Sequence, residues 1–500
     1  EEYYEELYRL YIDENQPLER RYRQLRESLE RVVREKIQGN SLQTTDLAAR
    51  INYVATQYGL DLKEQNQLHT FRLTSNDILN HRKSPVKEEF LRDLRAVAYA
   101  YRKMFAQDIP LKLFSVLPKQ EIASSGKKEK MEYIRRIRVC FDYADDTYLY
   151  VHPVDVIADE LIRVVYNKPG INHEFEETIK ELWRYAQLNL LDVSVDRDGI
   201  YTPSFIVLEP DYLIDISSLA ECYKDYGSHP ANYFLSRLVP IDNARPLLLG
   251  NIANLFLDEW IHAGEEEPDY IDCMKKAFRQ YPIELAACAE LRDPSKEKEF
   301  AKDCRMHFEH IRDVVQHTFL EPGYNLDKKE AVLEPSYICE ALGIQGRLDY
   351  MQRDMSSFIE MKSGKADEFS MQGKVEPKEN NKVQMLLYMA VLEYSMGQDR
   401  RRMHPYLLYT RYPLLYPARA SWAQVRRVIN LRNRIVAAEY GVQFHNHPDF
   451  TRNLLAQINP EVVNERKLSG RFWEQYLKPS ISRFREKLSA LEPLEQAYFY

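Results

Sequence analysis

Two stretches of the sequence predict a pair of neighbouring strands: Gly346-Arg347-Leu348-Asp349-Tyr350 and Phe358-Ile359-Glu360-Met361-Lys362. The residues between them, 353–357, are typical of a turn. Side chains two positions apart on a strand share a face, so Glu360 and Lys362 point the same way while Ile359 and Met361 point into the core. A simple antiparallel hairpin then sets Asp349 opposite Glu360. The sequence therefore predicts two carboxylates and one ammonium group on a single patch.

Such a patch is suited to binding a divalent cation. Two close carboxylates resist ionising together unless a cation holds them, and oxygen ligands favour Mg²⁺ or Mn²⁺. A metal of this kind can polarise a phosphodiester and lower the pKa of a bound water. Lys362 could orient that water or neutralise charge that develops on the phosphate. The alternative is a salt-bridged hairpin beside a core helix.

The segment that follows adds two further polar residues to the patch. A strongly apolar helix is predicted over about 380–395, and it carries Gln384 and Tyr388 four residues apart, on one face. A Glu-x-Lys sequence alone has little value, since the chain also contains Glu376-Pro377-Lys378. The order of Gly-Arg-x-Asp, Glu-x-Lys and Gln-x-x-x-Tyr is what favours a nuclease.

In that order, the three motifs resemble those of RecB-type nucleases in the PD-(D/E)xK superfamily. Residues 249–259 look like the first helical motif of that family. Residues 212–222 and 491–499 are similar to segments that flank the nuclease part of Dna-two-type nuclease–helicases. The resemblance covers about 210–500 and is strongest over 346–388.

The resemblance implies a divalent-metal-dependent DNA nuclease acting on single-stranded DNA or DNA ends. Its partner would be a helicase part, in the same full-length protein or separate, and its role repair, replication or defence against foreign DNA. The family pattern makes Asp349, Glu360 and the Met361 carbonyl metal ligands and gives Lys362 the task of assisting the nucleophile. Gln384 and Tyr388 would support Lys362 or contact the substrate strand.

The chain departs from the family pattern at two places. Relatives usually have a metal-binding histidine in the first helical motif, where this chain has Asn254, with Asp258 one turn further on. An attenuated or inactive domain that only binds DNA is therefore the alternative function. Many relatives also hold an iron–sulfur cluster, with one cysteine before this motif and three near the end. Cys222 suits the first position, but no cysteine follows Cys339, so we expect no cluster.

Residues outside the motifs indicate a multidomain α/β chain. Residues 1–106 have helical periodicity, and residues 107–215 form a β-rich, OB-like domain with strands expected at 111–116, 135–143, 148–151, 190–195 and 201–208 and a helix at about 173–188. Residues 216–500 make up the RecB-like nuclease domain, with its restriction-endonuclease-like α/β core and basic C-terminal helices.

Composition excludes several classes of protein. The longest apolar run, 385–392, is much shorter than the roughly 20 residues of a membrane span, so we expect no membrane association. The six cysteines are scattered, which favours free thiols in a reducing, cytoplasmic location. The net charge is -8, yet residues 401–500 contain 16 Lys/Arg and 8 Asp/Glu.

This basic segment is a candidate track for a nucleic-acid strand, because arginines bind phosphates and aromatic rings stack on bases. The same interleaving also arises in ordinary helix packing. The residues concerned are Arg400, Arg401, Arg402, Arg411, Arg419, Arg426, Arg427, Arg432 and Arg434, with Tyr406, Tyr409, Tyr412, Tyr416 and Trp422.

Overall fold

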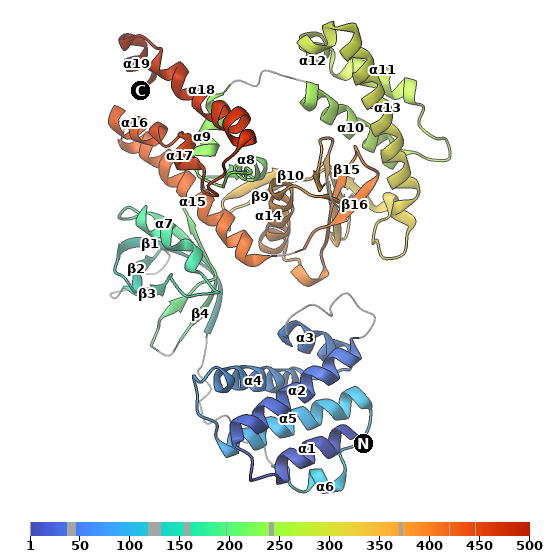
Figure 1. The fold of residues 1–500 in the computed structure, drawn as a ribbon, viewed down its shortest axis with the longest axis vertical. Coiled ribbons are helices and arrows are strands. Elements are labelled where there is room, and N and C mark those ends of the chain that lie inside the picture. The colour runs from blue at the N-terminus through green and yellow to red at the C-terminus, as the bar shows by residue number, and fades with distance from the viewer. Residues whose placement is uncertain are drawn as a thin grey trace. The chain divides into compact units, whose positions relative to one another are not determined.

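The computed structural model describes residues 2–37, 47–118, 132–154, 161–196, 198–239, 245–369, 374–419, 421–445 and 447–500 (Figure 1). The chain divides into two compact units, Glu1–Lys130 and Met131–Tyr500. The first unit has an apolar core of its own, built from side chains between Tyr4 and Leu117.

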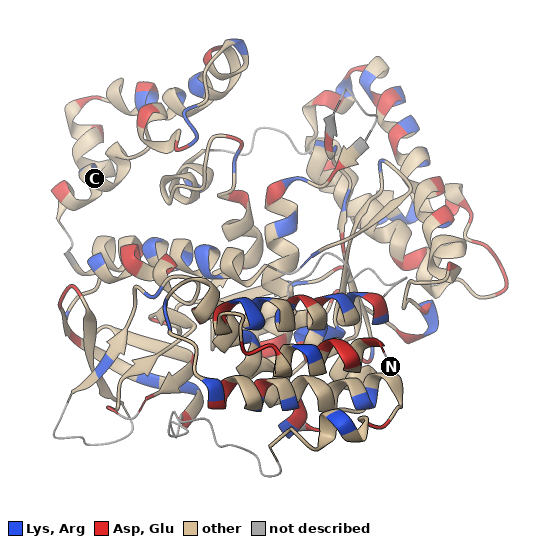
Figure 2. Cartoon of the chain, turned by 60° about the horizontal axis from the view of Figure 1, so that its bottom comes forward, with Lys and Arg blue, Asp and Glu red and all other residues tan. Residues whose placement is uncertain are grey.

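Helices make up the first unit over the residues described. Their apolar positions follow helical spacing, as in the second helix, where Leu25, Leu29 and Val33 are buried. Charged residues of both signs alternate along these helices (Figure 2). The strand predicted at 111–116 is wrong, since this segment starts with a short helix. The helices are α1 (Glu2–Ile12), α2 (Leu18–Lys36), α3 (Leu47–Gln57), α4 (Leu62–Leu79), α5 (Lys87–Phe105) and α6 (Leu111–Phe114).

A six-stranded sheet opens the second unit. Its strand order is β1-β2-β3-β5-β4-β6, and β1 also pairs with β4, so that β1 to β5 form a closed ring of pairings. The helix predicted at 173–188 is shorter than expected, because the chain enters strand β4 at Gln187. The elements are β1 (Glu132–Ala144), β2 (Tyr148–Pro153), β3 (Ile162–Val165), α7 (Glu176–Lys180), β4 (Gln187–Val195), β5 (Tyr201–Thr202) and β6 (Phe205–Leu208).

Two further sheets lie at the centre of the second unit. One has three strands in the order β7-β10-β9, and the other has five in the order β16-β15-β12-β11-β8. Strands β12 and β15 are parallel, and the helix α14 (Glu379–Met396) connects them. The strands are β7 (Ile214–Asp215), β8 (Ala331–Leu333), β9 (Ser336–Cys339), β10 (Ile344–Arg347), β11 (Tyr350–Gln352), β12 (Ser357–Lys362), β15 (His404–Tyr409) and β16 (Leu414–Pro417), and a separate pair is β13 (Asp367–Phe369) with β14 (Lys374–Glu376).

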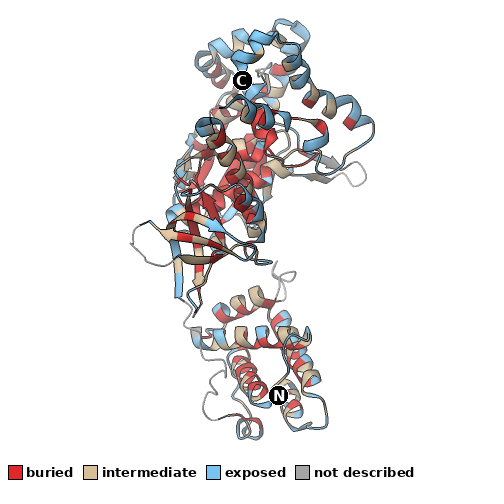
Figure 3. Cartoon of the chain, turned by 90° about the vertical axis from the view of Figure 1, so that its left-hand side faces the viewer, coloured by how far each residue is buried: buried red, intermediate tan, exposed pale blue. Residues whose placement is uncertain are grey.

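Helices complete the second unit. Helix α14 is apolar all round and is buried for most of its length, as an enclosed helix should be (Figure 3). The described helices include none with the length and apolar character needed to cross a bilayer. The remaining helices are α8 (Ile216–Glu221), α9 (Ala231–Leu238), α10 (Arg245–His262), α11 (Tyr270–Gln280), α12 (Pro282–Ala287), α13 (Pro294–Gln316), α15 (Trp422–His445), α16 (Pro448–Ala456), α17 (Pro460–Val463), α18 (Lys478–Ser489) and α19 (Pro493–Phe499).

Candidate active site

The predicted patch lies in a cleft of about 790 Å³ in the second unit. Helix α10 supplies one wall, strands β9 and β10 supply another, and the end of β12 and helix α14 close it. The predicted site residues that line this cleft are Asn254, Asp349, Glu360, Met361, Lys362, Gln384 and Tyr388.

The hairpin of β11 and β12 has the predicted register. Tyr350 pairs with Ile359 and Met351 pairs with Phe358 in an antiparallel ladder, so Asp349, one residue before β11, is level with Glu360. The Asp349 carboxylate also accepts a hydrogen bond of 2.6 Å from the Met361 backbone N–H. This bond fixes the position of one carboxylate relative to the strand that carries the other.

Lys362 is held by two partners at once. Its Nζ donates to Oε1 of Glu360 and to Oε1 of Gln384, each at 2.8 Å. The Gln384 amide nitrogen donates to the same Glu360 oxygen at 2.6 Å. Lysine, glutamate and glutamine therefore form a closed triangle of hydrogen bonds, which restricts the rotamers of all three side chains.

Burial gives these groups unusual protonation behaviour. Burial and the nearby Glu360 carboxylate raise the pKa of Asp349 well above its ordinary value. Burial also raises the pKa of Glu360, although Lys362 and Gln384 oppose the shift. Burial alone would lower the pKa of Lys362, but the Glu360 charge and hydrogen bond outweigh it, and the pKa is raised. Strongly shifted carboxylates in a cleft are typical of functional sites.

The glycine of the Gly-Arg-x-Asp motif is required by close packing. A Cβ atom at Gly346 would lie 3.0 Å from the Tyr388 hydroxyl and 3.0 Å from Ile216 Cδ1. The Tyr388 hydroxyl donates a hydrogen bond of 2.6 Å to the Arg347 carbonyl. Tyr388 is thus a support for the strand that leads to Asp349, and this contact connects α14 with β10.

Helix α10 presents one face to the cleft. Gly250, Asn251 and Asn254 line it, and their spacing is that of adjacent turns on one side of a helix. A Cβ atom at Gly250 would lie 3.4 Å from Ser363 Oγ, so the glycine allows α10 to approach the end of β12 closely. Asp258, predicted as a further metal ligand, is not among the residues that line this cleft. Burial and the nearby Glu334 raise its pKa.

The oxygen atoms of the cleft fit a hard divalent cation. Glu360 Oε2 is buried and has no hydrogen-bond partner in the part of the chain that the structure describes. An unpaired buried carboxylate oxygen is costly unless a cation or a proton compensates it. Asp349, the Met361 carbonyl and Asn254 add neighbouring oxygen atoms. No group of three or more His, Cys, Asp or Glu side chains poised for a metal occurs within the described ranges, so such an ion would also need backbone, amide or substrate oxygens.

Sequence reasoning missed several residues that line the cleft. Asp215 accepts a hydrogen bond of 2.9 Å from Gln345, and both lie in the cleft wall. Tyr337 joins the wall because β9 pairs with β10, which places Tyr337 opposite Gly346. Asn251 could have been found, since it shares a helix face with Asn254. Asp215 has no such signal, because only the long-range pairing of β7 with β10 brings it to the site.

The arginine-rich track has a largely structural role. Arg432 is completely buried, and Arg426 is paired at 3.0 Å with Glu174. Tyr406 and Tyr409 are buried as well. The prediction that these residues contact a nucleic-acid strand is wrong, because their side chains are used in packing. Arg401, by contrast, is well exposed.

Comparison with protein-family models and with curated proteins found no match for this chain.

Proposed function

We propose that residues 216–500 form a divalent-metal-dependent DNA nuclease domain of the RecB-like, PD-(D/E)xK type. The observation that carries this proposal is the arrangement of Asp349, Glu360 and Lys362. Two carboxylates from paired strands and one lysine line the same cleft, and Lys362 is held between Glu360 and Gln384. A salt bridge that served stability alone would not need a cleft beside it or an unpaired carboxylate oxygen.

The residues of the cleft have separate tasks in hydrolysis. Asp349, Glu360, the Met361 carbonyl and Asn254 would hold a Mg²⁺ or Mn²⁺ ion, which polarises a phosphodiester and lowers the pKa of water at the site. Lys362 keeps its charge, because its pKa is raised. Its ammonium group can therefore stabilise the negative charge that develops on the phosphate.

The second task is positioning. Gln384 bridges Lys362 and Glu360, so that the ammonium group and the carboxylate keep a fixed separation. Tyr388 holds the Arg347 carbonyl, and the Arg347 side chain is more than half exposed at the cleft, with a contact of 3.4 Å to Glu334. A guanidinium group in this place can bind a phosphate in a bidentate manner.

Single-stranded DNA or a DNA end is the proposed substrate, and a helicase part in the same protein or a partner is the proposed neighbour. We infer that the β-rich region is an OB-like barrel, supported by the closed ring of pairings and by the parallel pairing of β3 with β5. Barrels of this type commonly bind single strands.

The direct test is cleavage of a labelled single-stranded oligonucleotide by the full chain with Mg²⁺ or Mn²⁺. We expect Lys362→Ala to lower the cleavage rate by at least roughly a hundredfold, about 2.7 kcal/mol in the activation barrier, because the charge facing the phosphate is lost. A metal chelator should abolish cleavage by the wild type.

The matched control is Lys378→Ala, in the other Glu-x-Lys sequence, where the lysine is exposed and lies outside the cleft. This variant should cleave at the wild-type rate. Equal cleavage by wild type and Lys362→Ala would contradict the proposed chemistry.

A second candidate function is DNA binding without cleavage. The observation that favours it is Asn254, a neutral amide at the cleft position where the family pattern has a histidine. An amide oxygen binds a hard cation more weakly than a carboxylate does, so metal affinity would be reduced. Binding of the oligonucleotide without cleavage in either metal would favour this function.

A further inference from the structure

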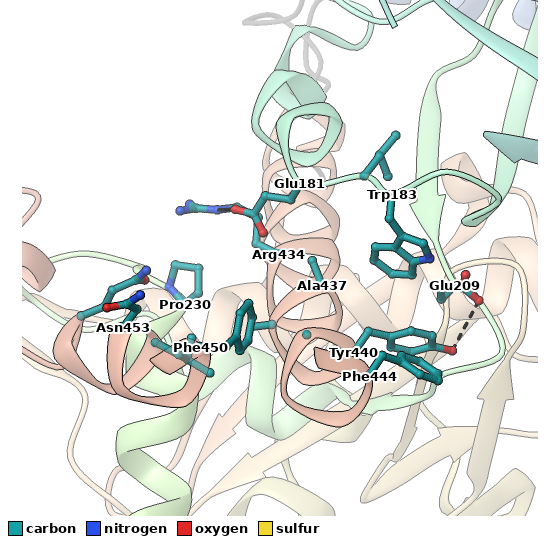
Figure 4. A pocket seen from close by; sticks show the side chains of 15 residues that line it. Glu181, Trp183, Glu209, Pro230, Arg434, Ala437, Tyr440, Phe444, Phe450 and Asn453 are labelled. Atoms are coloured by element: carbon teal, nitrogen blue, oxygen red, sulfur yellow. Dashed lines mark hydrogen bonds and ion pairs between the residues drawn. The ribbon is translucent and has the colours of Figure 1, made fainter. Parts of the chain in front are cut away.

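A second cavity, of about 990 Å³, lies in the same unit and shares no lining residue with the catalytic cleft. Helices α15 and α16 form most of it, and residues 181–183 and Pro230 complete the wall (Figure 4). We call it the aromatic groove. Its lining residues are Glu181, Leu182, Trp183, Glu209, Pro230, Arg434, Ala437, Ala438, Tyr440, Gly441, Phe444, Phe450, Asn453, Leu454 and Gln457.

Aromatic rings form one wall of the groove. Trp183 is stacked on Tyr440 with ring centroids 5.2 Å apart, and Tyr440 contacts Phe444 at the same distance. Figure 4 shows Phe450 on the other side of Ala437 from these rings. Rings in contact with one another are preorganised, so a ligand would meet a rigid apolar surface.

Small residues form the floor between the two walls. Ala437, Ala438 and Gly441 lie on adjacent turns of α15. A Cβ atom at Gly441 would collide with the ring of Phe450. The glycine therefore allows α16 to pack beside α15, while the alanines leave the space that the groove occupies.

Phe444 lies at the rim, and 69% of its surface is exposed. A large apolar side chain in this state, next to an apolar groove, is typical of an interaction surface. Tryptophan and tyrosine are also the residues that contribute most often to binding energy at protein interfaces.

The charges around the groove are mainly negative. Arg434 is paired with Glu177 at 2.9 Å and with Glu181 at 3.4 Å, so its single positive charge is shared by two carboxylates. Glu209, a third carboxylate, accepts a hydrogen bond from Tyr440. Burial raises the pKa of both Glu181 and Glu209, and a cation nearby would relieve this cost.

This pattern of charge excludes a phosphate-rich ligand and favours a basic one. We propose that the aromatic groove binds a basic amphipathic peptide segment of a partner protein. A large apolar side chain of the peptide would lie against Trp183, Tyr440 and Phe444. A neighbouring lysine or arginine would face Glu181 and Glu209. The amides of Asn453 and Gln457 line the far part of the groove and can bind the peptide backbone.

The test uses a short fluorescein-labelled peptide made of Arg, Lys, Leu and Phe, and its binding to the full chain is followed by fluorescence anisotropy. Phe444→Ser should weaken binding by roughly tenfold or more, the usual size of a loss at an interface anchor. Because Phe444 is exposed, this substitution leaves the core intact. Glu181→Gln should weaken binding as well, since one carboxylate is removed.

The control is Phe278→Ser in α11, where the side chain is similarly exposed at 55% and lies outside the groove. This variant should bind the peptide like the wild type. The proposal is overturned if the peptide does not bind, if Phe444→Ser binds it equally well, or if a peptide with Glu in place of Arg and Lys binds as tightly. It is also overturned if Phe444→Ser weakens binding of a single-stranded oligonucleotide and not of the peptide.

Discussion

Arg432 is a side chain whose charge is used entirely inside the protein. It is fully buried, and burial lowers its pKa to about 9. Its guanidinium group donates to backbone carbonyls at the end of β6 and in the segment before β10, regions that lie far apart in the sequence. The carbonyls belong to Leu208, Glu209, Tyr212 and Gly343.

We predict that Arg432→Met destabilises the second unit. The substitution leaves several buried carbonyls unpaired, and the free energy of unfolding should fall by roughly 3 kcal/mol, since each such group costs about 1–3 kcal/mol and the relief of a buried charge offsets part of it. The measurement is urea unfolding followed by tryptophan fluorescence. Arg427→Met, at an exposed position of the same helix, should change the value by less than about 0.5 kcal/mol. A similar loss in both variants would contradict the role given to Arg432.

A buried histidine should make stability depend on pH. His307 is fully buried, and burial lowers its pKa to about 4, whereas the unfolded chain has a histidine pKa of about 6.5. Between these values the unfolded state binds a proton that the folded state does not, so stability is lost as the pH falls through this window. From pH 7 to pH 5 this histidine should cost about 2 kcal/mol.

The measurement is urea unfolding of wild type and His307→Leu at both pH values. The variant should lose less stability on acidification than the wild type does. His404→Gln, where the histidine is exposed, should behave like the wild type. An identical pH dependence in His307→Leu and wild type would show that this histidine does not titrate as described.

At the scale of secondary-structure elements, the catalytic cleft depends on how closely helices approach strands. Gly346 lets α14 pack against β10 through Tyr388, and Gly250 lets α10 approach the end of β12. Neither glycine has a positive φ angle. Both are therefore required by the space available and not by backbone conformation.

We predict that Gly346→Ala weakens this contact. The added methyl group would lie 3.0 Å from the Tyr388 hydroxyl, so the ring must move and its hydrogen bond to Arg347 is strained. Overpacking of this kind costs typically about 1–3 kcal/mol of unfolding free energy, and the cleavage rate should fall with it. Thermal unfolding and the oligonucleotide assay measure the two effects. Gly264→Ala, where a Cβ atom meets nothing within 4 Å, is the control and should keep wild-type stability.

At the scale of the whole molecule, two units with separate cores should unfold as two transitions. All four tryptophans, at 183, 260, 422 and 473, belong to the second unit, so tryptophan fluorescence reports on that unit alone. Far-UV circular dichroism reports on the helices of both. We expect the two urea curves not to coincide, as for a protein that is not two-state. Coincident curves, with one midpoint for both signals, would contradict independent unfolding.

Part of the candidate site follows from local sequence patterns. The register of Asp349 with Glu360 depends on strand periodicity and on the length of one turn, and both are set by neighbouring residues. The helical face that carries Gln384 and Tyr388 is local in the same way. By contrast, 111–116 resembled a strand by composition but begins as a short helix, since a short apolar run fits either structure.

The sequence by itself determined the hairpin, the helices that flank it and the chemical nature of the patch, because each depends on contacts within a few turns or one reverse turn. Only the tertiary structure decided which segments wall the cleft, that Asp258 lies outside it, and that Arg432 is buried. These outcomes depend on pairings between segments far apart in the chain, such as β7 with β10. Whether an arginine faces solvent or a set of backbone carbonyls is decided by that packing, since its local sequence is compatible with both.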